Sequence, residues 1–414
     1  MTPPDRTRTG LVEFALAVGG FGIGAGEFAA MGLLPDIARG VDVETTTAGH
    51  LISAYALGVV VGAPLITAVF ARVERRVMLL ALMGAFALGN VLSALAPGYA
   101  SLMGLRFLSG LPHGAYFGVA SLVAADLAGP AHRARAVGRV MLGLTAATLV
   151  GAPLTTAIGQ TLGWRAAFVV FGAIGALAAL LVFLFVPDDG TDPDASPLRE
   201  LTAFARPQVW LTLGIGAIGS GGMFATFSYV TPTLTEVAGV PERIVPFALC
   251  AFGAGMIAGN LAGARLADRA LMPTIGLGLL WNAAMLGLFY FGSTTPATAV
   301  ANLFLIGTAF AIVPAVQTRL MDVAGDAQTL AAALNHSAFN VANALGAYVG
   351  GLAVAAGLGW RATGPVGLGF ALGGFGVFCA SVWLDRRVRR RAAPALPAAG
   401  PEGAAHGEAR ADAN

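Results

Sequence analysis

A carboxylate lies deep inside the first long apolar run of this chain. Glu27 is eight residues before Pro35, about 12 Å along a helix. A charged carboxylate at that depth in a bilayer costs on the order of 2.5–3.5 kcal/mol, so it should face the protein interior or water. Its helical face also carries Gly20, Gly24 and Met31, which we expect to leave room beside it. Since burial favours the neutral form, Glu27 is predicted to carry a proton or to anchor a cationic or hydroxyl-bearing substrate. The alternative is a neutral carboxyl group that hydrogen-bonds a neighbouring helix.

Arg106 is the matching cation, in the fourth apolar run. A permanent cation in a membrane needs a partner or backbone carbonyl groups. Gly110, Gly114 and Gly118 follow at four-residue spacing, a pattern that lets another helix approach closely. Arg106 either sets the proton affinity of Glu27 or braces its helix, and the sequence leaves both open.

Three histidines, His50, His113 and His336, lie within the apolar runs. An imidazole changes its charge near a pH of about 6.5, although a packed, hydrogen-bonded histidine is the more frequent case. We predict that His50 takes part in proton coupling with Glu27 and Arg106.

A second group of residues is predicted to line a substrate cavity. His336, Asn340 and Asn343 share one helical face. Phe224, Phe227 and Tyr116 can stack on an aromatic ligand, although aromatic residues in spans more often pack on neighbours or lipid. The predicted substrate contacts are Glu27, Tyr116, Phe224, Phe227, His336, Asn340 and Asn343.

These residues sit in a chain of membrane-protein composition. Of its 414 residues, 57% are hydrophobic and 11% are charged, whereas soluble chains are about a quarter charged. This composition excludes a soluble enzyme, and a net charge of +2 gives no reason to expect nucleic acid as a partner. Cys250 and Cys379 match no disulfide framework or metal site, and we expect no cofactor.

Apolar runs of about 20 residues, enough to cross a bilayer, occur in two sets of six. They are predicted at 11–34, 47–70, 76–97, 100–125, 138–160, 166–187, 209–232, 244–266, 273–292, 297–317, 329–357 and 363–384. The predicted fold is therefore an all-α membrane protein of twelve transmembrane helices in two six-helix bundles. The predicted domains are residues 1–187, a linker at 188–207, residues 208–384, and a basic, disordered tail at 385–414.

Arginine positions predict the orientation. With the N-terminus inside, 19 arginines lie in inside segments, four lie outside and one lies within a span. We therefore expect a multi-pass protein of the inner, or plasma, membrane with both termini in the cytoplasm.

The two halves resemble each other. Gly58-x-x-x-Gly62 recurs 197 residues later as Gly255-x-x-x-Gly259, and Gly163-Trp164-Arg165 recurs 196 residues later as Gly359-Trp360-Arg361. Parallel six-helix repeats are the plan of major facilitator transporters, which bind substrate between the halves.

Several motifs resemble the drug:proton antiporter branch of the major facilitator superfamily, which includes arabinose-type efflux permeases and actinomycete chloramphenicol exporters. The most specific are Gly26-Glu27-Phe28 through Ala38, Ala48-Gly49-His50-Leu51-Ile52-Ser53, Gly58 to Pro64 and Ser109 to Ala115. The resemblance extends over nearly the whole chain and implies a proton-relay role for Arg106.

The resemblance also implies a set of conformational residues. Arg72, Arg75 and Arg76 fit the family's loop motif after the second span, but Ala71 stands where the family has Asp. The equivalent loop after the eighth span keeps Asp268 and Arg269. Gly151 and Pro153 match the exporter motif of the fifth span, which favours efflux.

The sequence thus predicts proton-coupled efflux of a small molecule, such as a chloramphenicol-type drug, by alternating access. Efflux of a sugar or nucleoside is the alternative, and a membrane-embedded enzyme or a non-transporting receptor is more remote. The expected partners are the substrate, protons and membrane lipid, and we expect a monomer that is not an enzyme.

Overall fold

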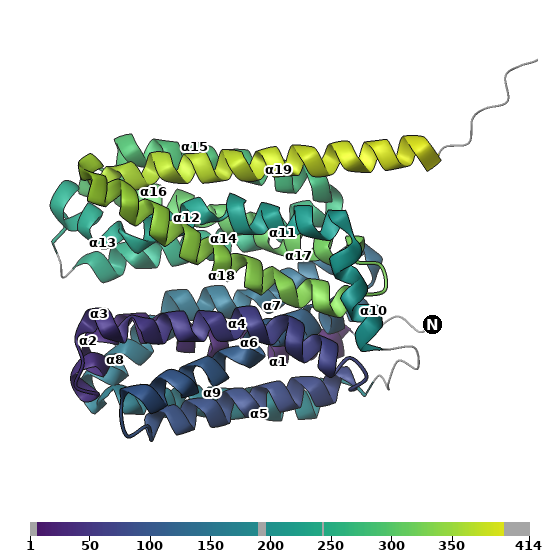
Figure 1. Cartoon of the computed structure of the whole chain (residues 1–414), viewed down its shortest axis with the longest axis horizontal. Helices are drawn as coiled ribbons and strands as arrows, with labels where there is room; N and C mark the ends of the chain where they lie inside the picture. The colour runs from purple at the N-terminus through teal and green to yellow at the C-terminus, as the bar shows by residue number, and fades with distance from the viewer. Residues whose placement is uncertain (1–5, 189–195, 242–243, 393–414) are drawn as a thin grey trace, which may run out of the picture.

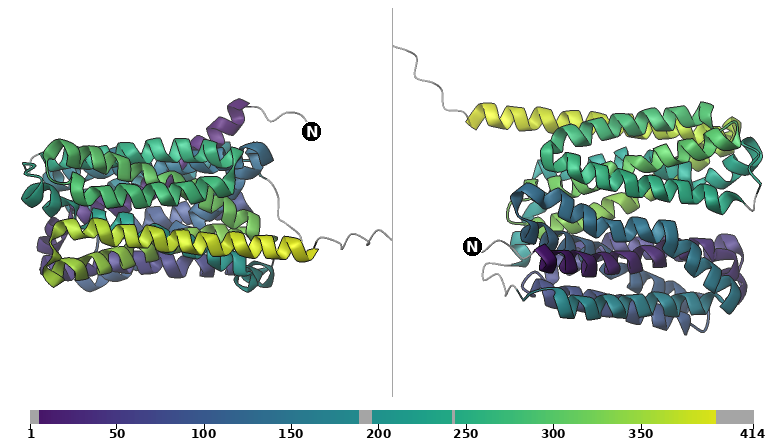
Figure 2. Two further views of the ribbon diagram at one scale, coloured as in Figure 1. Left: turned by 90° about the horizontal axis from the view of Figure 1, so that it is seen from above. Right: turned by 180° about the vertical axis from the view of Figure 1, so that it is seen from behind.

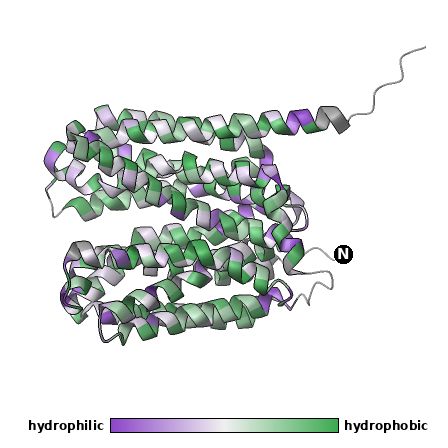
Figure 3. Cartoon of the chain, in the orientation of Figure 1, coloured by the Kyte–Doolittle hydropathy of each residue, from purple (hydrophilic) through white to green (hydrophobic). Residues whose placement is uncertain are grey.

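The computed structural model describes residues 6–188, 196–241 and 244–392, and in these ranges the chain is helical without β-strands. Twelve helical segments are long and apolar enough to cross a membrane. Each overlaps one of the twelve predicted runs, which confirms the predicted fold class. The most hydrophilic residues lie near the two ends of the bundle (Figure 3).

The first half contains six spans and two short helices. They are α1 (Arg6–Gly32), α2 (Leu34–Gly40), α3 (Thr45–Ala48), α4 (His50–Val69), α5 (Arg75–Ala94), α6 (Tyr99–Ala128), α7 (Arg133–Ala146) continued by α8 (Ala152–Leu162), and α9 (Trp164–Phe185).

The second half repeats this arrangement after a linker helix, α10 (Pro197–Leu201). Its elements are α11 (Pro207–Gly219), α12 (Gly221–Ser228), α13 (Val230–Pro232), α14 (Val245–Arg269), α15 (Leu271–Gly292), α16 (Pro296–Gly307), α17 (Ile312–Val323), α18 (Gln328–Ala353) and α19 (Thr363–Ala392). The expected tail therefore begins as part of α19. Its remainder, residues 393–414, lies outside the described residues, as do residues 189–195 of the predicted linker.

The two halves lie side by side, the first from purple to blue and the second from teal to yellow (Figure 1). Since twelve spans alternate in direction, α1 begins and α19 ends at the same end of the bundle (Figures 1 and 2). We call this end the terminal face and the opposite end the distal face.

The predicted repeat is visible in the helix contacts. A Cβ atom at Gly58 on α4 would lie 2.2 Å from the carbonyl oxygen of Phe107 on α6. A Cβ atom at Gly255 on α14 would lie 2.1 Å from the carbonyl oxygen of Phe304 on α16. Gly255 follows Gly58 by 197 residues, and Phe304 follows Phe107 by the same number. The same close helix contact therefore occurs in both halves and requires glycine in each.

The repeated Gly-Trp-Arg motif turns the chain at the distal face. Gly163 and Gly359 have φ angles of 89° and 77°, a region that glycine enters without steric cost. Arg165 donates to a carbonyl oxygen in the turn before α6, and Arg361 donates to one near the end of α15. The motif therefore ties equivalent turns to equivalent helices.

The fifth span is interrupted where the exporter motif was expected. A π-helical turn at Ala147–Gly151 separates α7 from α8, and Pro153 follows. Proline has no N–H group to continue the α-helical pattern. A Cβ atom at Gly151 would lie 2.9 Å from the Phe21 ring, so this glycine allows α1 to pack closely against the interrupted segment.

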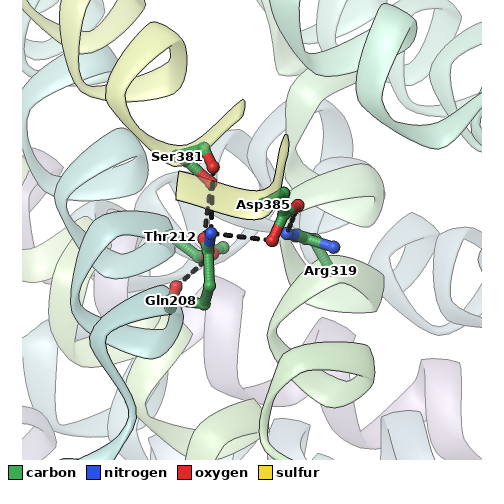
Figure 4. A network of polar contacts seen from close by, with 5 residues as sticks. All are labelled: Gln208, Thr212, Arg319, Ser381 and Asp385. Atoms are coloured by element: carbon green, nitrogen blue, oxygen red, sulfur yellow. Dashed lines mark hydrogen bonds and ion pairs between the residues drawn. The ribbon is translucent and has the colours of Figure 1, made fainter. Parts of the chain in front are cut away.

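A polar network joins three helices of the second half at the terminal face (Figure 4). Gln208 on α11 donates to the Ser381 carbonyl oxygen at 2.9 Å and to the Asp385 carboxylate at 2.8 Å, both on α19. Asp385 also pairs with Arg319 on α17. Since all three helices carry one carboxylate-centred network, we expect it to hold them together as a unit.

The halves approach each other most closely from the middle of the bundle to the terminal face. A Cβ atom at Gly118 on α6 would lie 2.7 Å from the Ala333 nitrogen on α18. Asn260 on α14 donates to the Gly138 carbonyl oxygen on α7 at 2.7 Å, and a Cβ atom at Gly138 would lie 2.5 Å from Ala264. Small residues therefore let the halves close at the terminal face.

Candidate functional site

A cavity of about 60 Å³ lies between the halves. It is lined by Glu27, Phe28, His113, Leu144, Met223, Phe224, Phe227, Phe252, Met256, Phe310, Val313, His336, Phe339, Asn340 and Asn343. Both halves contribute to this wall, which is mostly aromatic and aliphatic with a few polar groups. Such a composition is typical of a small-molecule site.

Glu27 reaches this cavity from α1, and its side chain is 14% exposed. The glycines before it do not leave the room that the sequence suggested. A Cβ atom at Gly20 would lie 3.0 Å from the Phe117 ring, and one at Gly24 would lie 2.8 Å from Leu144. The glycine face instead allows α6 and α7 to pack against α1, and the carboxylate emerges where this packing ends.

Arg106 lies on α6 and is only 2% exposed. Its guanidinium carbon is 4.3 Å from the centre of the Tyr55 ring on α4 and 5.7 Å from that of Phe168 on α9. Within the part of the chain that the structure describes, Arg106 and Glu27 form no direct ion pair, although their charges interact. The cation is therefore held mainly by aromatic faces and acts on Glu27 at longer range.

Two histidines connect this cluster with the other half. His113 Nδ1 on α6 lies 3.9 Å from Glu27 Oε2 and 3.2 Å from the Tyr55 hydroxyl. His113 Nε2 lies 3.3 Å from His336 Nδ1 on α18. Both histidines are almost fully buried. The polar groups thus form a continuous row from α1 and α4 through α6 to α18.

The remaining cavity wall is aromatic on the side of the second half. Phe227 on α12 stacks on Phe252 of α14, with ring centres 4.6 Å apart, and Phe224 lies one turn away. Asn340 donates to the His336 carbonyl oxygen at 2.9 Å, and Asn343 lies on the same face of α18. Five predicted substrate contacts of the second half thus share one wall.

Two of the predicted site residues lie elsewhere. Tyr116 is fully buried, and its hydroxyl group donates to the Leu16 carbonyl oxygen at 2.8 Å, so it joins α6 to α1 without lining the cavity. His50 is exposed at the distal start of α4, where its Nδ1 lies 3.3 Å from the Tyr99 hydroxyl. Neither residue belongs to the polar row.

The predicted loop motif contacts its own half. Arg75 pairs with Asp126 at 2.6 Å, and Arg76 donates to the Phe183 carbonyl oxygen at 2.6 Å. Arg72 lies in the turn between α4 and α5. These contacts connect the start of α5 with the ends of α6 and α9.

Asp268 forms the corresponding contact between the halves. Its carboxylate accepts from the backbone nitrogens of Ala134 and Arg135, at 2.8 and 3.3 Å, and pairs with the Arg135 side chain at 3.0 Å. It therefore caps the start of α7 from the end of α14, where a negative charge is favoured. Arg269, the last residue of α14, is exposed.

The start of α18 has a cap from the linker. Glu200 on α10 is 8% exposed and accepts from the Leu330 nitrogen at 2.8 Å. Burial raises the pKa of its carboxyl group, and the hydrogen bond from Leu330 opposes that effect. In the loop after the second span, Ala71 stands where the family that the motifs resemble has Asp. At the start of α18, the acid is supplied by Glu200 of the linker helix α10.

We expect Asp268→Asn to weaken closure of the terminal face. Loss of the charge-assisted cap and ion pair should cost about 1–2 kcal/mol, equal to about 5–30-fold in population. The measurement is the labelling rate of a cysteine at Ala264, which is 3% exposed, in a variant without Cys250 and Cys379. The labelling rate should rise.

Asp126→Asn is the matched control, because Asp126 pairs with Arg75 inside one half. It should leave the labelling rate unchanged. Equal rates in the wild type and Asp268→Asn would contradict a role of Asp268 in closure.

The sequence did not identify much of the cavity wall. Phe252, Phe310 and Phe339 carry no distinctive motif, and their spans also bear aromatic residues that point elsewhere. His113 was noted as titratable, but nothing in the sequence indicates its contact with His336, 223 residues away. The described residues contain no group of three or more potential metal ligands.

Comparison with known proteins places this architecture in a family. The model of the Major Facilitator Superfamily matches residues 16–327. The inner membrane transport protein YdhP of Escherichia coli is 42% identical over 84% of this chain and 89% of its own length. The putative transporter AraJ of E. coli is 34% identical over 95% and 99%, and the chloramphenicol resistance protein of Streptomyces lividans is 34% identical over 81% and 87%.

A solved structure gives the same result for the fold. The human organic anion transporter MFSD10 (TETRAN) superposes with a TM-score of 0.71 at 20% identity, covering 91% of this chain and 100% of that protein. The resemblance predicted from the motifs is confirmed. The chain belongs to the Major Facilitator Superfamily and is a multi-pass membrane transporter, not an enzyme.

Proposed function

We propose that this protein exports a small, mostly apolar compound in exchange for protons by alternating access. The observation that carries the proposal is the position of the Glu27 carboxylate in an aromatic cavity between two halves. A carboxylate there can exchange its proton with the solution on whichever side the cavity opens. Substrate and proton then compete for the same cavity, as exchange requires.

The proposed orientation places the terminal face in the cytoplasm. It rests on the excess of arginines in the segments at that end. Since the closest contacts between the halves lie toward the terminal face, the described conformation corresponds to the state that releases substrate to the outside. Exposed apolar side chains such as Phe247 and Phe291 would then face membrane lipid.

A chloramphenicol-type drug is the substrate class that we favour. The stacked Phe227 and Phe252 rings suit a planar aromatic group. The nearby Asn340 and Asn343 side chains suit amide and hydroxyl groups. The amides would also serve a sugar or nucleoside, which remains the second candidate.

Inverted membrane vesicles test the proposal. With an acidified interior, they should accumulate labelled chloramphenicol, and a protonophore should prevent this accumulation. A labelled pentose and a labelled nucleoside, tested in parallel, distinguish the second candidate. If none of the three compounds responds to the pH gradient, the proposal of proton-coupled export of these classes fails.

A further inference from the structure

The row of polar groups contains one link that crosses between the halves. His113 belongs to the first half and His336 to the second, and their ring nitrogens are 3.3 Å apart. The rings are 2% and 4% exposed. Phe117 stacks on His336, with ring centres 4.2 Å apart and planes inclined by 12°, which fixes the plane of the imidazole. The His113–His336 contact is thus a buried, oriented contact between the two halves of the transporter.

The hydrogen bond restricts the protonation of the two rings. A neutral imidazole has one N–H group and one bare nitrogen. His113 Nε2 and His336 Nδ1 face each other, so a hydrogen bond between them requires one nitrogen with hydrogen and one without. If both carried hydrogen, two donors would face each other and the bond would be lost. The tautomer of one ring therefore dictates that of the other.

The outer nitrogens of the pair face different surroundings. His113 Nδ1 faces the Tyr55 hydroxyl at 3.2 Å and Glu27 Oε2 at 3.9 Å. His336 lines the cavity, and its Nε2 is buried without a hydrogen-bond partner among the described residues. Such an orphaned nitrogen at a cavity wall is costly to leave unpaired, and a bound molecule can satisfy it.

We propose that His113 relays the protonation state of Glu27 to His336, whose Nε2 then presents either a donor or an acceptor to the substrate. This inference rests on the proposed function. It adds that His336 is the group through which the protonation of Glu27 changes the affinity for substrate. His113 acts here as a positioning residue and His336 as the binding residue.

The proposal requires two states of this row. When Glu27 is neutral, Tyr55 donates to His113 Nδ1, His113 Nε2–H donates to His336 Nδ1, and His336 Nε2–H points into the cavity. When Glu27 is ionised, His113 Nδ1–H faces the carboxylate, His336 Nδ1–H donates to His113 Nε2, and the lone pair of His336 Nε2 faces the cavity.

The conversion balances with one proton. Glu27 gives its proton to His113 Nδ1, His113 passes its Nε2 proton to His336 Nδ1, and His336 releases its Nε2 proton to water in the cavity. Both imidazoles remain neutral, and the net change is one proton moved from Glu27 to water. The first transfer requires Glu27 and His113 to approach from 3.9 Å or one water molecule between them.

Few other groups act on the pair. The titratable or charged groups near His113 in the described chain are Glu27 on α1, Tyr55 on α4, His336 on α18 and Arg106 on its own helix. The charged residues of α5 and α7 are at the terminal ends of those helices. Glu27 is therefore the only acid in this group that can drive the switch.

The proposal specifies the chemistry of the ligand. An exchanger needs substrate to bind best when Glu27 is ionised, which is the state with a lone pair on His336 Nε2. The substrate must therefore present a hydrogen-bond donor, such as a hydroxyl or amide N–H group, at that position. Protonation of Glu27 would place hydrogen on His336 Nε2. This nitrogen would then be a donor that faces the donor of the substrate, and the hydrogen bond would be lost.

Tautomers can be measured without any transport. Purified protein with isotope-labelled histidine nitrogens gives distinct nuclear magnetic resonance signals for the Nδ1–H and Nε2–H forms, and His336→Gln identifies the signal of His336. In the wild type, the His336 signal should change from Nε2–H to Nδ1–H as pH rises. In Glu27→Gln, where residue 27 stays neutral, it should remain Nε2–H.

The proposal is overturned if the His336 tautomer stays the same in the wild type, or if it changes equally in Glu27→Gln. His132→Gln is the matched control, because His132 is exposed at the terminal face outside the row. Since this readout needs no substrate, its failure is distinct from a failure of proton-coupled export.

Binding supplies the second readout. Chloramphenicol, which carries hydroxyl groups and an amide N–H, should bind wild-type protein about tenfold more tightly at mildly alkaline than at mildly acidic pH, the effect of one hydrogen bond gained or lost. In His113→Gln, whose amide cannot exchange tautomers, the difference should shrink to about twofold or less. An unchanged pH dependence in this variant would contradict the relay.

Discussion

Glu27→Gln should abolish the ability of a pH gradient or membrane potential to drive export, while the protein remains folded in the membrane. Glutamine matches the size of the side chain but carries no exchangeable acidic proton. One proton that crosses about 100 mV contributes about 2.3 kcal/mol, equal to about 50-fold in the substrate concentration ratio. Vesicles with this variant should therefore lose about 50-fold in steady-state accumulation at that potential.

Two variants control for indirect effects. Glu27→Asp keeps a carboxyl group near the cavity and should keep part of the coupling. Glu236→Gln changes a glutamate at the distal face, where it pairs with Trp360, and should keep full accumulation. Undiminished accumulation by Glu27→Gln would show that the coupling proton binds elsewhere.

Gly118→Val should prevent the halves from closing at the terminal face and stop transport. A Cβ atom at this position would lie 2.7 Å from the backbone nitrogen of Ala333 and 2.9 Å from its Cα and Cβ atoms. Backbone atoms cannot rotate away as a flexible side chain does, so α6 and α18 must separate. Overpacking of this kind costs about 1–3 kcal/mol, which shifts the conformational equilibrium by about 5–150-fold.

Gly104→Val tests whether the effect is specific to this contact. Gly104 lies on the same helix, and a Cβ atom there meets nothing within 4 Å, so transport should continue. Gly118→Val should also speed the labelling of a cysteine introduced at the terminal face. Normal transport by Gly118→Val would mean that closure does not use this contact.

The sequence predicted the fold because its information is local. Each span is an apolar run of sufficient length, and all twelve overlap the observed helices. The repeat was visible because close backbone contacts, such as Gly58 on Phe107, require glycine at fixed positions in both halves. Glu27 was identifiable because a deep acid in an apolar run is rare and costly.

The composition of the cavity wall was less accessible, because it depends on how distant helices pack. The sequence predicted Phe227 and Tyr116 equally as substrate contacts, because the direction of each side chain depends on packing. Phe227 lines the cavity, whereas the Tyr116 hydroxyl group donates to the Leu16 carbonyl oxygen. The pairing of His113 with His336 exists only after the halves have docked. The same holds for Glu200, whose role depends on where the linker helix settles.

The exchange of substrate for protons is tested most directly by following both in the same liposomes. Purified protein is reconstituted with chloramphenicol on one side and a pH-sensitive dye inside, with no imposed pH gradient. Chloramphenicol moving down its gradient should drive protons in the opposite direction in the wild type, and Glu27→Gln should show no proton movement. Protons that move in the same direction as the substrate, or substrate movement without any proton movement in the wild type, would contradict proton-coupled export.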